Sequence, residues 1–200
     1  MRPPPRLLVV TDATQAVHPL WEVLDAAIAA GARAIVLREH AMAPKRRAEL
    51  AGRLHQRLSE VGGTLLLGVS GEAPEGVPAH GWHLAARARP LDASGVLVGR
   101  SCHSPGELAA AEAEGAAYAT VSPVYVSDSK PGYGPALGPV GLSVLCGRTA
   151  VPVYALCGIT GPERVRECRE AGAHGVAVMG SVMRAEDPGA LVAELLDALG

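Results

Sequence analysis

A short recurring pattern constrains the fold of this chain more than any other feature: a helix end, a glycine and a run of apolar residues. It occurs in "AAGARAIVLRE" (29–39), "EGAAYATVSPVY" (114–125) and "EAGAHGVAVMG" (170–180), with a weaker copy in "PAHGWHLAA" (78–86). Glycine takes the left-handed conformation that ends many helices, and the apolar run after it is typical of a buried strand. Because these runs are almost continuously apolar rather than alternating, they predict parallel strands that are covered on both faces.

Extending this pattern along the sequence predicts eight strands with helices between them. The expected strands span residues 7–11, 34–38, 64–69, 81–84, 96–101, 117–122, 152–157 and 174–179, and the clearest helices span 19–30, 44–60, 104–114, 161–171 and 188–199. Eight strand–helix units favour the α/β class, with residues 1–200 forming one domain, a single (β/α)8 TIM barrel. A flavodoxin-like or Rossmann sheet is the alternative, but it leaves the last two strands without a place.

Three of the expected helices start with capping signals. Ser104 and Thr160 are each followed three residues later by a glutamate, which is the pattern of a capping box. Asp187 stands before a proline at the first helical position, where the missing N–H of proline costs nothing.

Composition and charge exclude several classes of protein. The formal net charge is −2 and no block of Lys or Arg stands out, so we expect no binding to a nucleic-acid backbone. The four cysteines form no C-x-x-C pair, which favours a reduced intracellular chain. No run approaches the roughly eighteen apolar residues that span a bilayer, and the first residues lack the apolar core of a signal peptide. We therefore predict a cytoplasmic protein with no membrane contact.

In a barrel of this kind the active site is built at the C-terminal ends of the strands. The last two strands end in "YALCGITGPE" and "VAVMGSVMR", where glycine-rich backbone leads into a helix. Loops of this kind commonly bind phosphate through backbone N–H groups, although the same glycines would also serve tight turns. The predicted phosphate-binding residues are Gly158, Ile159, Met179, Gly180 and Ser181.

Other polar residues follow the second, fifth and sixth strands. Arg38 and His40 come after "IVL" and either bind a substrate or, in the case of Arg38, form a salt bridge with a glutamate. Lys130 lies in a long loop after the sixth strand, where it either meets a substrate anion or is solvated. His103 follows the fifth strand directly, and since histidine is a side chain that can give and take protons, it is the candidate acid–base group. No serine or cysteine with an orienting acid indicates a nucleophilic triad.

Together these motifs resemble the thiamine phosphate synthase superfamily. The resemblance rests on "LREH", "GWHLAA", "VGRSCHSPGE", "SPVYVSDSKPGYGPALG", "YALCGIT" and "GAHGVAVMGSVMRAEDP", which occur in the family's order over nearly the whole chain. It implies a (β/α)8 barrel that binds a small-molecule thiazole phosphate, with Arg38, His40, Ser101 and Lys130 as substrate-binding residues and with self-association into a homo-oligomer. The family holds two activities, thiamine phosphate synthase and thiazole tautomerase.

Departures from the family pattern bear on which activity is present. The synthase requires Mg²⁺, and the resemblance places its two ligating aspartates at positions occupied here by Val69 and Ala88. Gly68 stands in place of an asparagine and His40 in place of a lysine. Because Mg²⁺ prefers carboxylate ligands, this chain lacks the main stabiliser of a departing pyrophosphate.

The resemblance therefore implies a tautomerase-like isomerase that needs neither metal nor cofactor. Such an enzyme aromatises a carboxythiazole phosphate by moving a proton, with His103 as the catalytic acid–base group. A divergent thiamine phosphate synthase and a non-catalytic phosphate-binding regulatory barrel are the alternatives.

Overall fold

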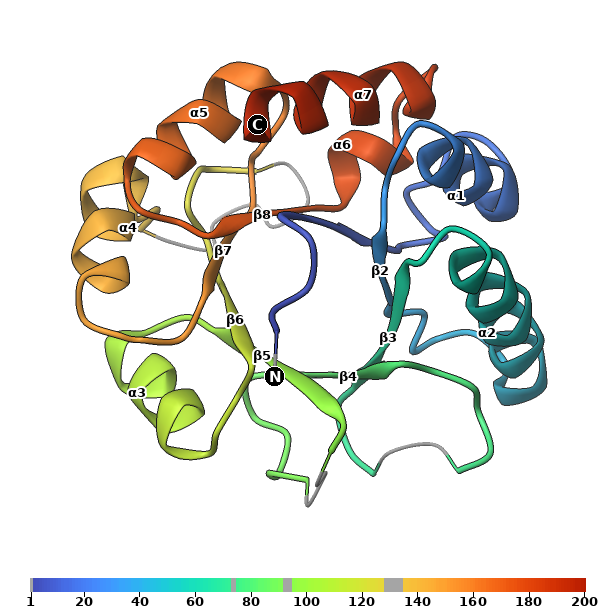
Figure 1. Ribbon diagram of the computed structural model, residues 1–200, viewed down its shortest axis with the longest axis horizontal. Helices are drawn as coiled ribbons and strands as arrows, with labels where there is room; N and C mark the ends of the chain where they lie inside the picture. The colour runs from blue at the N-terminus through green and yellow to red at the C-terminus, as the bar shows by residue number, and fades with distance from the viewer. Residues whose placement is uncertain (1, 73–74, 92–94, 128–134) are drawn as a thin grey trace.

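The computed structural model describes residues 2–72, 75–91, 95–127 and 135–200. Parallel strands and helices alternate over most of this length (Figure 1). The strands are β1 (Leu7–Val10), β2 (Ala34–Leu37), β3 (Thr64–Val69), β4 (Gly81–Leu84), β5 (Leu97–Cys102), β6 (Tyr118–Val121), β7 (Val153–Leu156) and β8 (Gly175–Val178). The helices are α1 (Leu20–Ala29), α2 (Pro44–Ser59), α3 (Pro105–Ala113), α4 (Gly138–Cys146), α5 (Pro162–Glu170), α6 (Gly180–Met183) and α7 (Pro188–Leu199).

The eight strands close into a barrel in sequence order, and β1 pairs with β8 in parallel. This confirms the predicted TIM barrel and excludes the open-sheet alternative. Each end of the strands predicted from the apolar runs lies within one residue of the observed end. Helices pack around the outside of the sheet (Figure 1). No helix among the described residues is long and apolar enough to cross a membrane.

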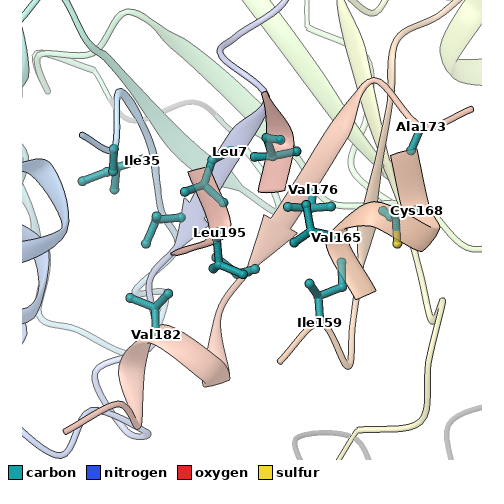
Figure 2. Close-up of a cluster of buried hydrophobic side chains, with 14 of the residues drawn as sticks. Leu7, Ile35, Ile159, Val165, Cys168, Ala173, Val176, Val182 and Leu195 are labelled. Atoms are coloured by element: carbon teal, nitrogen blue, oxygen red, sulfur yellow. The ribbon is translucent and has the colours of Figure 1, made fainter. Parts of the chain in front are cut away.

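Alternating side chains of each strand contribute to two apolar layers. The inner layer fills the barrel with small aliphatics and two large rings, Tyr118 and Tyr154, which are fully buried. The outer layer lies between the strands and the helices, and Figure 2 shows a part of it with Val176 of β8, Val165 of α5 and Leu195 of α7. Coverage on both faces explains why the strand sequences are almost continuously apolar.

The prediction of eight regular strand–helix units is wrong around β4. No helix occurs between β3 and β5 in the described part of the chain, and loops lie on that side of the barrel in Figure 1. The connecting sequences, "GEAPEGVPAH" and "RARPLDASG", are rich in proline and glycine, which destabilise helices. The helix expected between the sixth and seventh strands does occur as α4, but the sequence pattern gave it no bounds, because its first four residues include two glycines and a proline.

The three capping signals have different outcomes. Asp187 caps α7 as predicted, accepting a hydrogen bond from Ala190 N–H. Ser104 caps α3 through Glu107 N–H, but the Glu107 carboxylate accepts from the backbone N–H of His103 rather than from that of the cap residue. The predicted Thr160 cap is wrong, because α5 begins at Pro162 and its N-cap is the extended Gly161.

Candidate active site

A pocket of about 350 Å³ opens at the C-terminal ends of the strands. Most of the site residues predicted from sequence line it, and they come from β2, β5, β7, β8 and the loops that follow them. They are Arg38, His40, Ser101, His103, Gly158, Ile159, Met179, Gly180 and Ser181. Lys130 lies outside the described residues. The fold therefore brings these residues to one cavity, while the role of each in binding or catalysis stays a prediction.

His103 is held at both its backbone and its ring. Its backbone N–H donates to Glu107 Oε2 at 2.5 Å, at the start of α3. Its ring Nδ1 lies 3.0 Å from the carbonyl oxygen of Ser122 and 3.1 Å from the hydroxyl of the same residue. Because a carbonyl oxygen can only accept, the neutral ring fits this contact with its hydrogen on Nδ1 and its lone pair on Nε2. The ring can then accept a proton at Nε2.

The loop after β7 has an unusual backbone conformation at the pocket. Cys157 has φ of +86° and Gly158 has φ of +71°. A Cβ on Gly158 would lie 2.6 Å from the Cβ of Tyr125, so only glycine fits there without a shift of the backbone. The guanidinium of Arg164 in α5 donates to the Gly158 carbonyl. Strain held by neighbouring contacts in this way is frequent at binding sites.

The loop after β8 turns directly into α6. Gly180 and Ser181 are in its first turn, where backbone N–H groups have no acceptor within the helix. Arg184, at the end of the same turn, lines the pocket and donates to the side-chain oxygen of Gln15. This loop therefore offers backbone donors and a guanidinium beside the loop that follows β7.

Arg38 forms an ion pair at the mouth of the barrel. Its NH2 group lies 2.7 Å from Asp12 Oδ2, and the Asp12 carboxylate also accepts from Thr14 and Gln15. Burial alone would raise the pKa of Asp12, but those hydrogen bonds and the charge of Arg38 together lower it below its usual value. Arg38 thus forms a salt bridge as the alternative expected, but its partner is Asp12 rather than a glutamate, and the guanidinium still lines the pocket.

His40 lies beyond Arg38 at the rim of the pocket. Desolvation lowers its pKa, and the positive charges of Arg47 and Arg38 lower it further. Arg47 comes from α2 and donates to the Gly68 carbonyl at 2.6 Å, which fixes the end of β3. His40 is therefore a neutral polar group at pH 7.

The positions at which the family resemblance places magnesium ligands are apolar and packed. Val69 and Ala88 are 3% and 4% exposed and form a cluster with Leu84. Arg100 stabilises the loop after β4 by donating a hydrogen bond to the Ala88 carbonyl at 2.6 Å. Across the described residues, no group of three His, Cys, Asp or Glu side chains is arranged to hold a metal ion. This donor set does not fit Mg²⁺, which prefers carboxylate oxygens.

The chemistry available in the pocket is anion binding and proton transfer. Its ionisable lining residues within the described segments are arginines, histidines and Cys157, without a carboxylate. Backbone donors lie at one side of the cavity, and His103 comes from another strand. Such a site suits a small phosphorylated molecule that exchanges a proton.

Sequence reasoning missed several residues of the pocket. Ser122 lines it because β6 ends beside β5, a contact that no local motif indicates. Arg184 follows Gly180 by one helical turn, so its position could have been inferred from the helix start after β8. His83 of β4 is buried and also lines the pocket.

Comparison with known proteins gives a consistent match. A family model described as thiamine monophosphate synthase matches residues 7–182. A putative thiamine-phosphate synthase of Geobacter sulfurreducens is 37% identical over 192 residues, covering 91% of this chain and 88% of the relative. A thiamine-phosphate synthase of Salinispora tropica is 33% identical, covering 97% of both chains.

One solved structure agrees with these matches. The thiamine phosphate pyrophosphorylase from Pyrococcus furiosus superposes with a TM-score of 0.84 at 28% identity, over 97% of this chain and 95% of that one. The likeness therefore extends over the entire barrel, including the strand ends that form the pocket.

Proposed function

The chain belongs to the thiamine monophosphate synthase family of thiamine biosynthesis, and within this family we propose that it is a metal-independent isomerase acting on a thiazole phosphate. The reaction is the aromatisation of a carboxylated, non-aromatic thiazole phosphate by a proton shift. The catalytic acid–base group is His103.

One observation carries the choice of reaction: the apolar cluster of Val69, Leu84 and Ala88. Transfer of a pyrimidine group with loss of pyrophosphate develops negative charge that Mg²⁺ normally stabilises. The side chains of a buried valine and alanine donate no oxygen ligand, and the carboxylate of Asp12 is already engaged by Arg38. An internal proton shift needs neither the metal nor a second substrate.

The proton shift follows from the anchoring of His103. With the ring hydrogen on Nδ1 directed to Ser122, the Nε2 lone pair removes a proton from a saturated ring carbon of the substrate. The resulting imidazolium returns the proton to a substituent carbon outside the ring, whose exocyclic double bond moves into the ring, so protons and charge balance over the cycle and the ring becomes aromatic. General acid–base catalysis of this kind contributes about 10²–10⁴-fold to a rate.

Substrate binding uses the two ends of the pocket. The backbone donors after β7 and β8 suit the phosphate, with the Arg184 guanidinium beside them. Arg38 suits the carboxylate, because a guanidinium already paired with one carboxylate retains further N–H donors.

A thiamine phosphate synthase is the second candidate, and the names of the relatives favour it. In that case the protein would use the same phosphate loops and join a pyrimidine pyrophosphate to the thiazole. It would require a metal held largely by the substrate's own phosphates, since the protein side of the site is apolar at Val69 and Ala88.

Two assays on the same purified protein separate these candidates. The first follows aromatisation of the carboxythiazole phosphate by NMR in the presence of a chelator. The second follows release of pyrophosphate from the pyrimidine pyrophosphate and the thiazole phosphate with saturating Mg²⁺. We expect acceleration in the first assay alone; acceleration in the second alone would replace the isomerase with the synthase.

A further inference from the structure

Three neighbouring strands place His83, Gly99 and Tyr118 in one row across the barrel. In the strand register His83 pairs with Gly99, and Gly99 pairs with Tyr118. A Cβ on Gly99 would lie 2.0 Å from the Tyr118 ring and 2.5 Å from its hydroxyl. The absence of a side chain on Gly99 therefore lets the phenol of Tyr118 cross β5 and reach His83.

Ser101 connects this row of residues to the pocket. Tyr118 OH lies 2.9 Å from His83 Nδ1, and Ser101 Oγ lies 2.9 Å from His83 Nε2. Thr120 Oγ1 is more distant, at 3.5 Å from the same nitrogen. Tyr118 is fully buried, whereas His83 and Ser101 line the pocket. A continuous chain of hydrogen bonds thus runs from the barrel core to the ligand cavity.

The direction of these hydrogen bonds follows from the partners available. His83 Nδ1 is the hydrogen-bond contact of the Tyr118 hydroxyl among the described residues. A buried O–H without an acceptor is costly, so the phenol donates to Nδ1. The ring hydrogen is then on Nε2 and is donated to Ser101 Oγ. Complete burial lowers the pKa of His83 to about 4, so the ring stays neutral and keeps a single hydrogen at pH 7.

We propose that Tyr118 and His83 are positioning residues that fix Ser101 as a hydrogen-bond donor to the bound ligand. Since Ser101 Oγ already accepts from His83, its own hydrogen is available to the pocket. The group that it meets must carry a lone pair, such as a carboxylate oxygen or an uncharged ring heteroatom. A ligand with an N–H at that point could use only the second lone pair of Ser101 Oγ and would leave the hydroxyl hydrogen without an acceptor, so the chain favours ligands that accept.

This inference concerns the polarity of the pocket and not the reaction, so it can be tested without the isomerase assay. The direct measurement is the ¹⁵N NMR spectrum of histidine-labelled protein without ligand, with His83 assigned by its loss in the His83→Gln variant. We expect the Nε2–H tautomer, unchanged from pH 5.5 to 8.5. A hydrogen on Nδ1 would overturn the proposal.

Variants test whether the tautomer controls binding. Tyr118→Phe removes the donor while keeping the ring, so both tautomers of His83 become populated and the two ring nitrogen signals move toward each other. Tyr154→Phe is the matched control, because its hydroxyl donates to the Pro4 carbonyl and has no contact with His83.

The probe for binding is the thiazole phosphate, titrated by calorimetry. Tyr118→Phe and Ser101→Ala should each weaken affinity about three- to tenfold, the worth of one neutral hydrogen bond, and the double variant should lose no more than either alone. Additive losses, or unchanged affinity in Tyr118→Phe, would contradict the proposal. If wild type does not bind thiazole phosphate, the proposed function fails while the tautomer measurement still decides this inference.

Discussion

His103 and Ser122 meet where β5 and β6 end side by side, with the ring Nδ1 of His103 3.0 Å from the carbonyl oxygen of Ser122. Because of this contact, the two ring nitrogens of His103 have different roles. Nδ1 holds the orientation of the ring, and Nε2 exchanges protons. The arrangement depends on strand pairing in the closed barrel, because Cys102 pairs with Val121 in the residues just before.

Chelation should not affect the isomerisation. The Val69 and Ala88 side chains supply no oxygen ligand, so adding a chelator to the aromatisation assay should leave kcat and KM unchanged. The control is a Mg²⁺-dependent phosphotransferase in the same buffer, which must lose its activity. Loss of aromatisation on chelation, with recovery on adding Mg²⁺, would contradict the metal-independent mechanism.

Restoring a carboxylate at position 69 should destabilise the fold. Val69 is 3% exposed and packs against Leu84 and Ala88, so Val69→Asp places an unpaired charge in an apolar cluster. We expect a loss of about 2–4 kcal/mol in the free energy of unfolding, measured by urea denaturation at pH 7.5. The adjacent Ser70 is exposed, and Ser70→Asp should change stability by less than about 0.5 kcal/mol. Equal effects of both variants would show that the site already tolerates a carboxylate.

Stability should fall in mildly acidic solution because His83 is buried in its neutral form. Burial lowers its pKa from 6.5 to about 4. Between pH 6.5 and 4, His83 is therefore protonated in the unfolded chain but neutral in the folded chain. The stability from this residue is fully present above pH 6.5 and decreases as the pH falls toward 4. The total loss in the free energy of unfolding that His83 causes over this pH range is about 3 kcal/mol.

Urea unfolding of wild type and His83→Gln across this pH range checks the expectation. The variant should be less stable at pH 8, and its stability should decline less between pH 6.5 and 4 than that of wild type. The comparison is needed because desolvation also lowers the pKa of His80 and His174. Parallel curves for the two proteins would show that His83 is not the group responsible.

Gly158 and Gly161 offer a matched pair for testing the loop after β7. A Cβ at Gly158 would collide with Tyr125 at a φ of +71°, whereas nothing lies within 4 Å of a Cβ at Gly161. Gly158→Ala should lose about 1–3 kcal/mol of stability and weaken the binding of thiazole phosphate, because the backbone must move. Gly161→Ala should bind as wild type does. Calorimetry on both variants distinguishes a phosphate-binding loop from a simple turn, for which affinity would be unchanged in both.

The predicted strands were recovered because their residues are buried on both faces, which makes the apolar signal continuous. The absence of helices on either side of β4 was not predicted. The strand repeat implies a helix in each connection, whereas the proline and glycine of those connections oppose one. The position of α4 was not predicted for the opposite reason, because tertiary packing of Leu142 and Leu145 stabilises a helix of weak propensity.

The pocket residues were predictable where they follow a strand directly, as Arg38 and His103 do. The hydrogen-bond chain from Tyr118 to Ser101 was not predictable in this way. It joins side chains from three strands, and His83 and Tyr118 are 35 residues apart in the sequence. Its signal in the sequence is Gly99, the residue without a side chain in β5. The role of that glycine becomes clear only once the strand register is known.

The central claim is most directly tested by the rate at which the carboxythiazole phosphate becomes aromatic, followed by ¹H NMR with wild type, His103→Ala and His55→Ala. His55 stacks on His80 and does not line the pocket, so its variant controls for the loss of a histidine elsewhere. We predict that His103→Ala slows the reaction about 10²–10⁴-fold while thiazole phosphate still binds, and that His55→Ala behaves as wild type. Equal rates for wild type and His103→Ala would contradict the account.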